Sequence, residues 1–219
     1  MWKERATKAE EDLAKAQAEA AKARQDLARA QAEWKAYKPD PPNPGPVVAD
    51  PATTAILVLD VNNAKVNDPA NPASRMAPRL KGLLDRARAA KVLIVHTISL
   101  NGVGTAAGSL WDGFQAGPDE PILAPDAFDK FHGGQLQEVL ARQAVKTLIV
   151  TGSSTNGAVL YTATSAARVF NHNVIIPTDA VVAHTQYQQD YSLYQFTVLP
   201  GNVSKKFSFT TIDQLTFKR

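Results

Sequence analysis

Length, composition and charge are those of an ordinary globular protein: 219 residues, 44% hydrophobic and 21% charged, are enough for one well-buried domain. The chain has no cysteine, which excludes disulfides, thiolate zinc sites and thiol catalysis together. The net charge of +3 comes from basic residues interleaved with acidic ones, without a nucleic-acid motif, so we expect no nucleic-acid binding.

The first 38 residues predict a long alanine-rich coiled-coil helix. Apolar residues alternate at spacings of four and three: Trp2, Ala6, Ala9, Leu13, Ala16, Ala20, Ala23, Leu27, Ala30, Trp34 and Tyr37. This heptad seam predicts a left-handed supercoil with a partner helix over residues 2–37, either a second copy in a homo-oligomer or a different protein. A lone solvated helix is the alternative, because Ala, Glu, Lys, Gln and Arg are strong helix formers.

No stretch is apolar enough for a membrane span or an intact signal peptide, and the compartment stays open between the cytoplasm and a mature exported form.

A proline-rich segment follows the helix. Six prolines lie between Lys38 and Ala52, and they predict an extended linker over residues 39–51. We expect the globular domain to occupy residues 52–219.

The rest of the chain alternates apolar β-rich runs with helical patterns. Strands are expected at 55–60, 92–98, 147–152, 173–179 and 206–211, with helices at about 75–90, 134–143 and 156–170. Because the strands are apolar throughout, they predict a parallel sheet that helices cover on both faces. Ligands of such sheets bind beyond the carboxyl ends of the strands, so function is expected near Asp60, 96–101, 152–158 and Asp179.

Two of these strand ends carry a recognisable pattern. Asp60 ends the first strand, and the sequence TGSSTNGAVLYTA forms a sharp strand–turn–helix whose backbone N–H groups could cradle an anion. Together with DKFHGGQLQEVLARQAVKTLIVTG, these elements resemble the isochorismatase-like superfamily, often called cysteine hydrolases. The resemblance covers most of residues 52–185 and implies a three-layer α/β/α (Rossmann-like) domain with strand order 3-2-1-4-5 and a sixth strand at an edge.

The resemblance assigns candidate site residues one by one. Asp60 matches the family's aspartate, and Thr151, Gly152, Thr155 and Asn156 match its turn. The family's nucleophilic cysteine position is Ala158, which cannot act as a nucleophile. Lys130 is the nearest lysine to the family's catalytic one, but it lies five residues later than the usual spacing.

In the isochorismatase proper, as the resemblance implies, a carboxyl group helps water to cleave an enol ether without a covalent intermediate. Asp60 is the candidate for this role, as a proton donor or as a base that orients water. If Lys130 reaches Asp60, it would hold the carboxylate ionised and would bind or orient an anionic substrate instead. For Asp60, the alternative is a turn residue that caps local N–H groups.

Further residues complete the expected substrate-binding set: Asn62, His96, Ser153, Ser154, Thr155, Asn156 and Ala158. The resemblance implies a cis peptide between Ser153 and Ser154, and we expect Asp60, Asn156 and Ala158 to line one cleft. His96 is expected at the edge of the pocket.

No metal or other cofactor is expected, because the histidines lack the spacing of a metal site. Trp111 and Phe114 either line the pocket or anchor their loop to the domain.

Two functions remain open. One is an isochorismatase-like hydrolase that acts on a small, anionic substrate without a cysteine. The other is a catalytically inactive protein of this fold that serves as an assembly or binding module through its N-terminal helix.

Overall fold

The computed structural model describes residues 2–37 and 40–218, with side chains described for 7–35 and 40–218. The chain forms two compact units, Met1–Pro39 and Asp40–Arg219. No helix in these described ranges combines the length and apolarity that crossing a bilayer requires.

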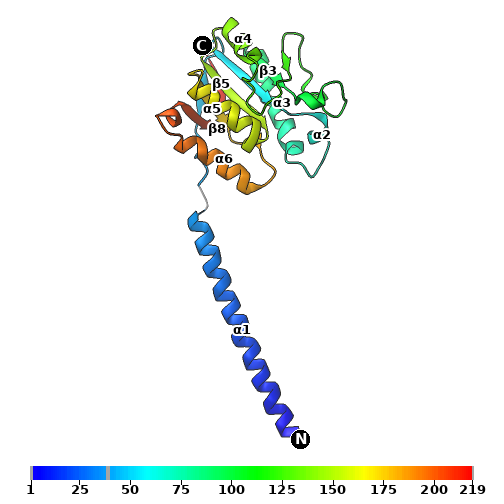
Figure 1. Cartoon of the computed structure of the whole chain (residues 1–219), viewed down its shortest axis with the longest axis vertical. Helices are drawn as coiled ribbons and strands as arrows, with labels where there is room; N and C mark the ends of the chain where they lie inside the picture. Colours follow the sequence, from blue (N-terminus) through cyan, green and yellow to red (C-terminus); the bar gives the residue numbers. More distant parts are fainter. Residues whose placement is uncertain (1, 38–39, 219) are drawn as a thin grey trace. The chain divides into compact units, whose positions relative to one another are not determined.

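The first unit is a single helix, α1 (Trp2–Tyr37), which confirms the predicted helix (Figure 1). Its large apolar side chains lie open to solvent: Leu13 and Leu27 are each 59% exposed. Along the outside, Arg29 and Glu33 form an i,i+4 ion pair at 3.0 Å. Whether the helix pairs with another helix stays a prediction.

The second unit contains a parallel sheet in the order β4-β3-β2-β5-β6-β8, with β7 paired to β5 beside this path. Numbered along the chain, the strands β2 to β6 lie in the predicted order 3-2-1-4-5, with β4, which was not located in the sequence, as strand 3 at one edge and β8 as the sixth strand at the other. The strands are β2 (Thr54–Leu59), β3 (Leu93–Thr97), β4 (Ile122–Leu123), β5 (Thr147–Ser153), β6 (Asn173–Pro177), β7 (Val181–Val182) and β8 (Phe207–Thr210).

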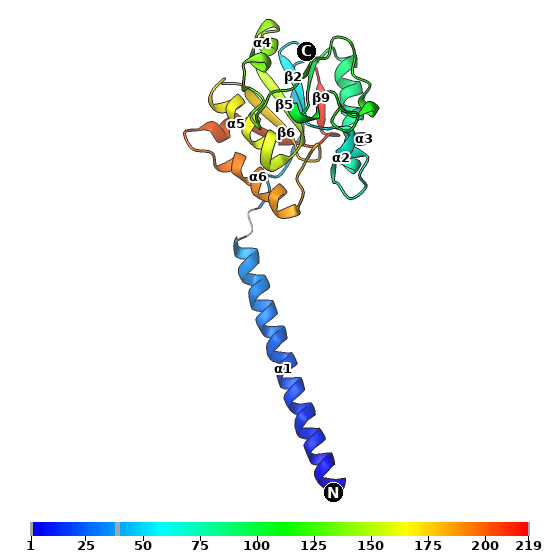
Figure 2. The same ribbon diagram turned by 45° about the vertical axis from the view of Figure 1, so that its right-hand side comes forward.

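Helices cover both faces of this sheet, which confirms the three-layer α/β/α class (Figure 2). The helices are α2 (Asn63–Val66), α3 (Ala73–Ala89), α4 (Gln135–Arg142), α5 (Leu160–Arg168) and α6 (Gln186–Val198). Short turns of helix are η1 (Leu100–Gly102), η2 (Asp112–Phe114), η3 (Thr155–Val159) and η4 (Val203–Lys206).

Strand β2 shows how the sheet supports two cores. Ile56 and Val58 pack with residues of α3, whereas Leu57 and Leu59 pack with residues of α4, α5 and α6. Every residue of β2 is buried, and each fully buried aliphatic side chain contributes about 1.5–3 kcal/mol to stability. The central strands are therefore fixed firmly, and their carboxyl ends give the site a rigid base.

The second half of the predicted linker 39–51 contains a short strand that pairs with the end of the domain. Strand β1 (Val47–Ala49) pairs in parallel with β9 (Leu215–Phe217) as a separate two-stranded sheet. The N–H of Gly45 also donates to the carbonyl of Phe209 at 3.0 Å. A three-residue strand among prolines has no alternating pattern to reveal it, and its partner lies at the far end of the sequence.

The helix expected at 156–170 is divided in two. Residues Thr155–Val159 form a wide π-type turn in which Gly157 leaves helical geometry at φ −127°, ψ −109°, and regular α5 begins only at Leu160. This turn lies directly after β5, at the edge where the site was expected.

Candidate active site

Asp60 is the first residue after β2 and is fixed by the neighbouring strand β3. Its backbone adopts the left-handed conformation, with φ of 52°. The Asp60 N–H donates to the carbonyl of Thr97 at 3.0 Å, and the Thr97 hydroxyl donates to Asp60 Oδ1 at 2.9 Å. Two adjacent strand ends thus hold the carboxylate in one orientation.

Lys130 reaches the other oxygen of this carboxylate. Its Nζ lies 2.9 Å from Asp60 Oδ2, and its side chain is 2% exposed. The ammonium also donates to the carbonyl of Ala127 at 3.1 Å, and the Lys130 N–H donates to the Thr162 hydroxyl at 3.0 Å. A buried lysine needs such a partner set, because an uncompensated charge in the interior is strongly destabilising.

A second lysine, Lys65, contacts the backbone of Asp60. Its Nζ donates to the Asp60 carbonyl oxygen at 2.9 Å. Burial lowers the pKa of Lys65 below its usual value; the Asp60 carboxylate opposes this shift and the Lys130 ammonium adds to it. Asn62 caps α2 by accepting a hydrogen bond from the Lys65 N–H at 3.0 Å, so it positions Lys65. One ammonium group therefore pairs with the Asp60 carboxylate, and a second binds the backbone carbonyl of the same residue.

Two cavities adjoin this charged group. One of about 510 Å³ is lined by Asp60, Ser99, Leu100, Asn101, Pro125, Asp126, Ala127, Phe128 and Lys130. Another of about 420 Å³ is lined by Lys65, Asn71, Ser153, Ser154, Asn156, Val182, Ala183, His184 and Gln188. We call them the Asp60 cavity and the Lys65 cavity. The hydrogen bond between Lys65 and Asp60 links their linings.

The turn after β5 forms part of the Lys65 cavity. The peptide between Ser153 and Ser154 is cis, as predicted. Ser153, Ser154 and Asn156 line the cavity, whereas the Thr155 hydroxyl points away and donates to Gln189 Oε1 at 2.6 Å. Gln189 Nε2 in turn donates to the Val181 carbonyl at 2.9 Å, so one side chain of α6 ties the turn to β7.

The start of this turn requires glycine. Gly152 has φ of +110°, and a Cβ atom there would lie 2.1 Å from the carbonyl oxygen of Leu59. Only glycine lets β5 approach β2 so closely, directly beside Asp60.

The expectation that Asp60, Asn156 and Ala158 line one cleft is wrong. Asp60 and Asn156 line different cavities, and Ala158 lines neither of the two. Ala158 is 2% exposed and packs within the core on the α5 face. Gly157, the residue before it, departs from helical geometry.

His96 lies away from both cavities. It is fully buried, its Nε2 lies 2.7 Å from Glu120 Oε2, and its ring is close to Phe114. Burial lowers the pKa of His96; the Glu120 carboxylate opposes this shift, and Arg88 adds to it. Burial would raise the pKa of Glu120, but its hydrogen bonds with Arg88 and His96 outweigh this effect and hold it below its ordinary value.

Phe114 anchors its loop to the domain. It is fully buried and meets Trp111 edge-on, with ring centroids 5.1 Å apart. Its carbonyl accepts a hydrogen bond from Arg88 at 3.0 Å. Of the two roles considered for this residue, the packing supports that of an anchor.

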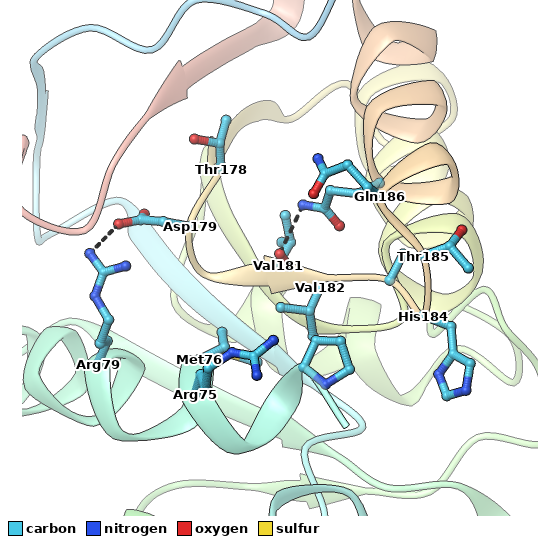
Figure 3. A pocket seen from close by; sticks show the side chains of 13 residues that line it. Arg75, Met76, Arg79, Thr178, Asp179, Val181, Val182, His184, Thr185 and Gln186 are labelled. Atoms are coloured by element: carbon cyan, nitrogen blue, oxygen red, sulfur yellow. Dashed lines mark hydrogen bonds and ion pairs between the residues drawn. The ribbon is translucent and has the colours of Figure 1, made fainter. Parts of the chain in front are cut away.

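A third cavity, of about 510 Å³, shares Val182, Ala183 and His184 with the Lys65 cavity (Figure 3). Arg79 on its wall pairs with Asp179 at 2.6 Å. Arg75 forms no ion pair within the described residues, and it adds positive charge to this wall. No group of three or more His, Asp or Glu side chains in the described part of the chain is placed to hold a metal ion.

The globular domain is similar to known proteins. The profile described as isochorismatase domain matches residues 54–204. The chain belongs to the isochorismatase family. Its domain is 31% identical over 134 residues to a streptothricin hydrolase from Streptomyces noursei, covering 58% of this chain and 48% of that protein. The chain thus spans about half the length of this curated relative.

Solved structures of the isochorismatase fold are also similar. An isochorismatase family protein from Desulfovibrio vulgaris subsp. vulgaris str. Hildenborough has a TM-score of 0.63 at 22% identity, covering 74% of this chain and 95% of that one. A nicotinamidase from Staphylococcus aureus has a TM-score of 0.62 at 19% identity, covering 73% and 97%. At these identities the likeness concerns the fold alone.

Sequence reasoning missed two residues of the candidate site. Thr97 lies within the expected strand-end range but was not singled out. Lys65 follows Asp60 by five residues, and nothing in the local pattern distinguishes it from a solvent-exposed helix lysine. Its role depends on the tight turn that brings α2 back over Asp60.

Proposed function

We propose that the domain is a hydrolase that acts on a small, anionic substrate without a covalent cysteine intermediate. In this proposal Asp60 is the catalytic carboxylate and Lys130 is its electrostatic partner. The observation that carries it is the 2.9 Å contact between Lys130 Nζ and Asp60 Oδ2 at the wall of a cavity of about 510 Å³. The contact also supports Lys130 as the counterpart of the family's lysine despite its shifted spacing.

The hydrogen bonds of Asp60 favour a base that orients water. Both oxygens accept hydrogen bonds, Oδ1 from Thr97 and Oδ2 from Lys130, as an ionised carboxylate does. In the proposal water is the nucleophile, because the chain has no cysteine and Ala158 stands at the position of the family's nucleophile. The Asp60 carboxylate takes a proton from the water while the oxygen of the water bonds to the electrophilic carbon of the substrate. The carboxyl group then returns the proton to the leaving group as the scissile bond breaks, so that one water is consumed per turnover.

Lys65 supports an anionic substrate. Lys65 lines the cavity of about 420 Å³, whose lining includes no carboxylate. Arg75 lines the third cavity, which adjoins it. Burial lowers the pKa of Lys65 because it disfavours the charged ammonium form. A bound anion would stabilise that charged form. In the proposal the anionic group of the substrate therefore binds beside Lys65, with its reactive bond near Asp60.

The contact between Lys130 and Asp60 also bears on the alternative, an inactive binding module. The inactive module was favoured by the displaced lysine and by the missing cysteine. Because Lys130 reaches the Asp60 carboxylate, its shifted spacing no longer speaks against catalysis. The missing cysteine remains compatible with catalysis by water.

The test is hydrolysis of a panel of small amides, esters and enol ethers, each in a carboxylate-bearing and a neutral form, followed by product detection. We expect turnover of an anionic member, and a loss of about 10²–10⁴ in rate for Asp60→Asn. Asp126→Asn is the matched control, because Asp126 is an exposed carboxylate of the same cavity. Lys65→Gln should raise KM for the anionic substrate with little change in kcat.

Two outcomes would contradict the proposal. One is a wild-type protein that hydrolyses no member of the panel, and the other is an Asp60→Asn variant as active as wild type. Iodoacetamide should leave the wild type unaffected.

A further inference from the structure

The apolar seam of α1 can be written in heptad positions. With Leu13, Ala20, Leu27 and Trp34 at position a, the alanines Ala9, Ala16, Ala23 and Ala30 occupy position d. The helix spans 36 residues, about five heptads, and Leu13 and Leu27 are each 59% exposed. A heptad pattern over this length is typical of a coiled coil rather than of a helix that is merely stable in water.

The residues that flank the seam differ in charge on its two sides. At position g the described residues are all acidic: Asp12, Glu19, Asp26 and Glu33. At position e they are Glu10, Gln17, Arg24 and Gln31. Residues at e and g set the orientation of paired helices, because they meet across the interface.

A parallel, in-register pair brings each g residue against the e residue five positions later in the partner. Glu19 then meets Arg24 of the other copy, and this attraction occurs twice by symmetry. Asp12 meets Gln17 and Asp26 meets Gln31, so no like charges meet among the described residues. The sequence before them continues the pattern, with Arg5 at g opposite Glu10 at e.

An antiparallel pair brings g residues against g residues. In the register that aligns Leu13 with Ala30, Asp12 meets Glu33 and Glu19 meets Asp26, each twice. Like charges at these positions oppose association. The charge pattern therefore favours the parallel pair over the antiparallel one.

We propose that α1 is the dimerisation element of this protein and forms a parallel, in-register, two-stranded coiled coil with a second copy of the chain. Leu13 and Leu27 each pack against their own counterparts, and the alanines at position d allow the two backbones to approach closely. This proposal does not depend on the hydrolase function, since it rests on the helix alone.

Light scattering on the full chain tests the association. We expect twice the chain mass at micromolar concentration and the single-chain mass for the double variant Leu13→Lys/Leu27→Lys, because charged side chains would be buried at the seam. Circular dichroism shows whether that variant keeps its folded domain. A wild-type chain that is monomeric up to high micromolar concentration, or of higher order than a dimer, overturns the proposal.

Cysteine cross-linking tests the orientation, and the chain has no native cysteine to interfere. Ala9→Cys and Ala30→Cys lie near opposite ends of the seam at position d. In a parallel pair each variant forms a disulfide-linked dimer by itself, because identical residues face each other within the 4.4–6.8 Å Cα separation that a disulfide needs. Ala28→Cys on the outer face is the control and should cross-link slowly. In the antiparallel register that aligns Leu13 with Ala30, Ala30→Cys would instead cross-link only when mixed with Leu13→Cys, and that outcome would show an antiparallel pair.

Charge reversal gives an independent test, because it changes the dimer affinity in opposite directions for parallel and antiparallel pairs. Glu19→Arg places a second guanidinium against Arg24 in the parallel pair and should weaken dimerisation about tenfold, whereas it would strengthen an antiparallel pair by meeting Asp26. The double variant Glu19→Arg/Arg24→Glu has the composition of the wild type and should restore its affinity. Failure of this restoration, or a gain of affinity in Glu19→Arg, contradicts the parallel arrangement.

Discussion

Two groups of charged side chains are buried beside neighbouring strands, and they differ in charge balance. In one, the Asp60 carboxylate pairs with Lys130, and the Asp60 backbone carbonyl accepts a hydrogen bond from Lys65. In the other, Glu120 accepts hydrogen bonds from Arg88 at 2.6 and 3.1 Å and lies 2.7 Å from His96. A cavity of about 510 Å³ adjoins each carboxylate, so volume does not distinguish them.

The two groups differ in whether every positive charge has a carboxylate partner. Arg88 holds both oxygens of Glu120 in a fork and also pairs with Asp85, so this group has no surplus positive charge. Lys130 and Lys65 both contact Asp60, and the lining of the Lys65 cavity holds a lysine and no carboxylate, whereas Asp126 adds a second carboxylate to the Asp60 cavity. A surplus charge at a cavity, rather than burial alone, therefore suggests a site for a charged ligand.

The largest expected effect is on the Asp60 side. Lys130→Met leaves the Asp60 carboxylate buried without its partner, and it should lower the free energy of unfolding by about 3–5 kcal/mol. Chemical denaturation measures this change. The double variant Asp60→Asn/Lys130→Met should recover part of the loss, because it removes the unpaired charge. Additive losses would show that the two side chains do not act as a pair.

A smaller effect is expected for the other group. Glu120→Gln keeps the shape but weakens the hydrogen bonds to Arg88 and His96, and it should lower the free energy of unfolding by about 1–3 kcal/mol. Substrate turnover should not change, since Glu120 lies outside both proposed site cavities. A fall in kcat with unchanged stability would reverse the roles that the comparison assigns to the two groups.

The smallest effect concerns pH. The pKa of His96 is lowered by burial in the folded state, so below the unfolded value of about 6.5 the unfolded chain binds the proton first. Stability should therefore fall as the pH falls below about 6.5. It should fall further below about 4.3, the unfolded value for Glu120, whose folded pKa is also lowered. His96→Gln should reduce the first slope, as measured by melting temperature between pH 7 and 5.

That slope should be reduced rather than abolished. Burial also lowers the pKa of His172, which remains in the variant and acts in the same direction. A slope in His96→Gln equal to that of the wild type would show that His96 does not contribute.

The sequence predicted the sheet because the central strands are apolar throughout, and a buried parallel strand needs no further signal. It could not reveal β1 and β9, whose three residues each carry no periodicity and whose pairing joins distant parts of the chain. Strand β4, of two residues, was missed for the same reason.

The candidate site divides along similar lines. Asp60 and Lys130 were identified because strand ends and a family motif mark them, and the structure places them 2.9 Å apart. Lys65 was missed because its place follows from a turn rather than from periodicity. His96 was expected at the pocket because it precedes a strand end by one residue. Strand alternation instead directs its side chain to the face that carries Phe114.

The side chain of Gln189 has a consequence for motion. It joins α6, the turn at Thr155 and the carbonyl of Val181 through two hydrogen bonds. These three segments supply most of the lining of the Lys65 cavity, and the hydrogen bonds of Gln189 oppose their separation. Lys65 and Asn71 come from a different part of the chain and complete the lining. Widening of the cavity to admit a ligand therefore breaks fewer of these bonds if the segment around α2 moves than if α6 and the turn move apart.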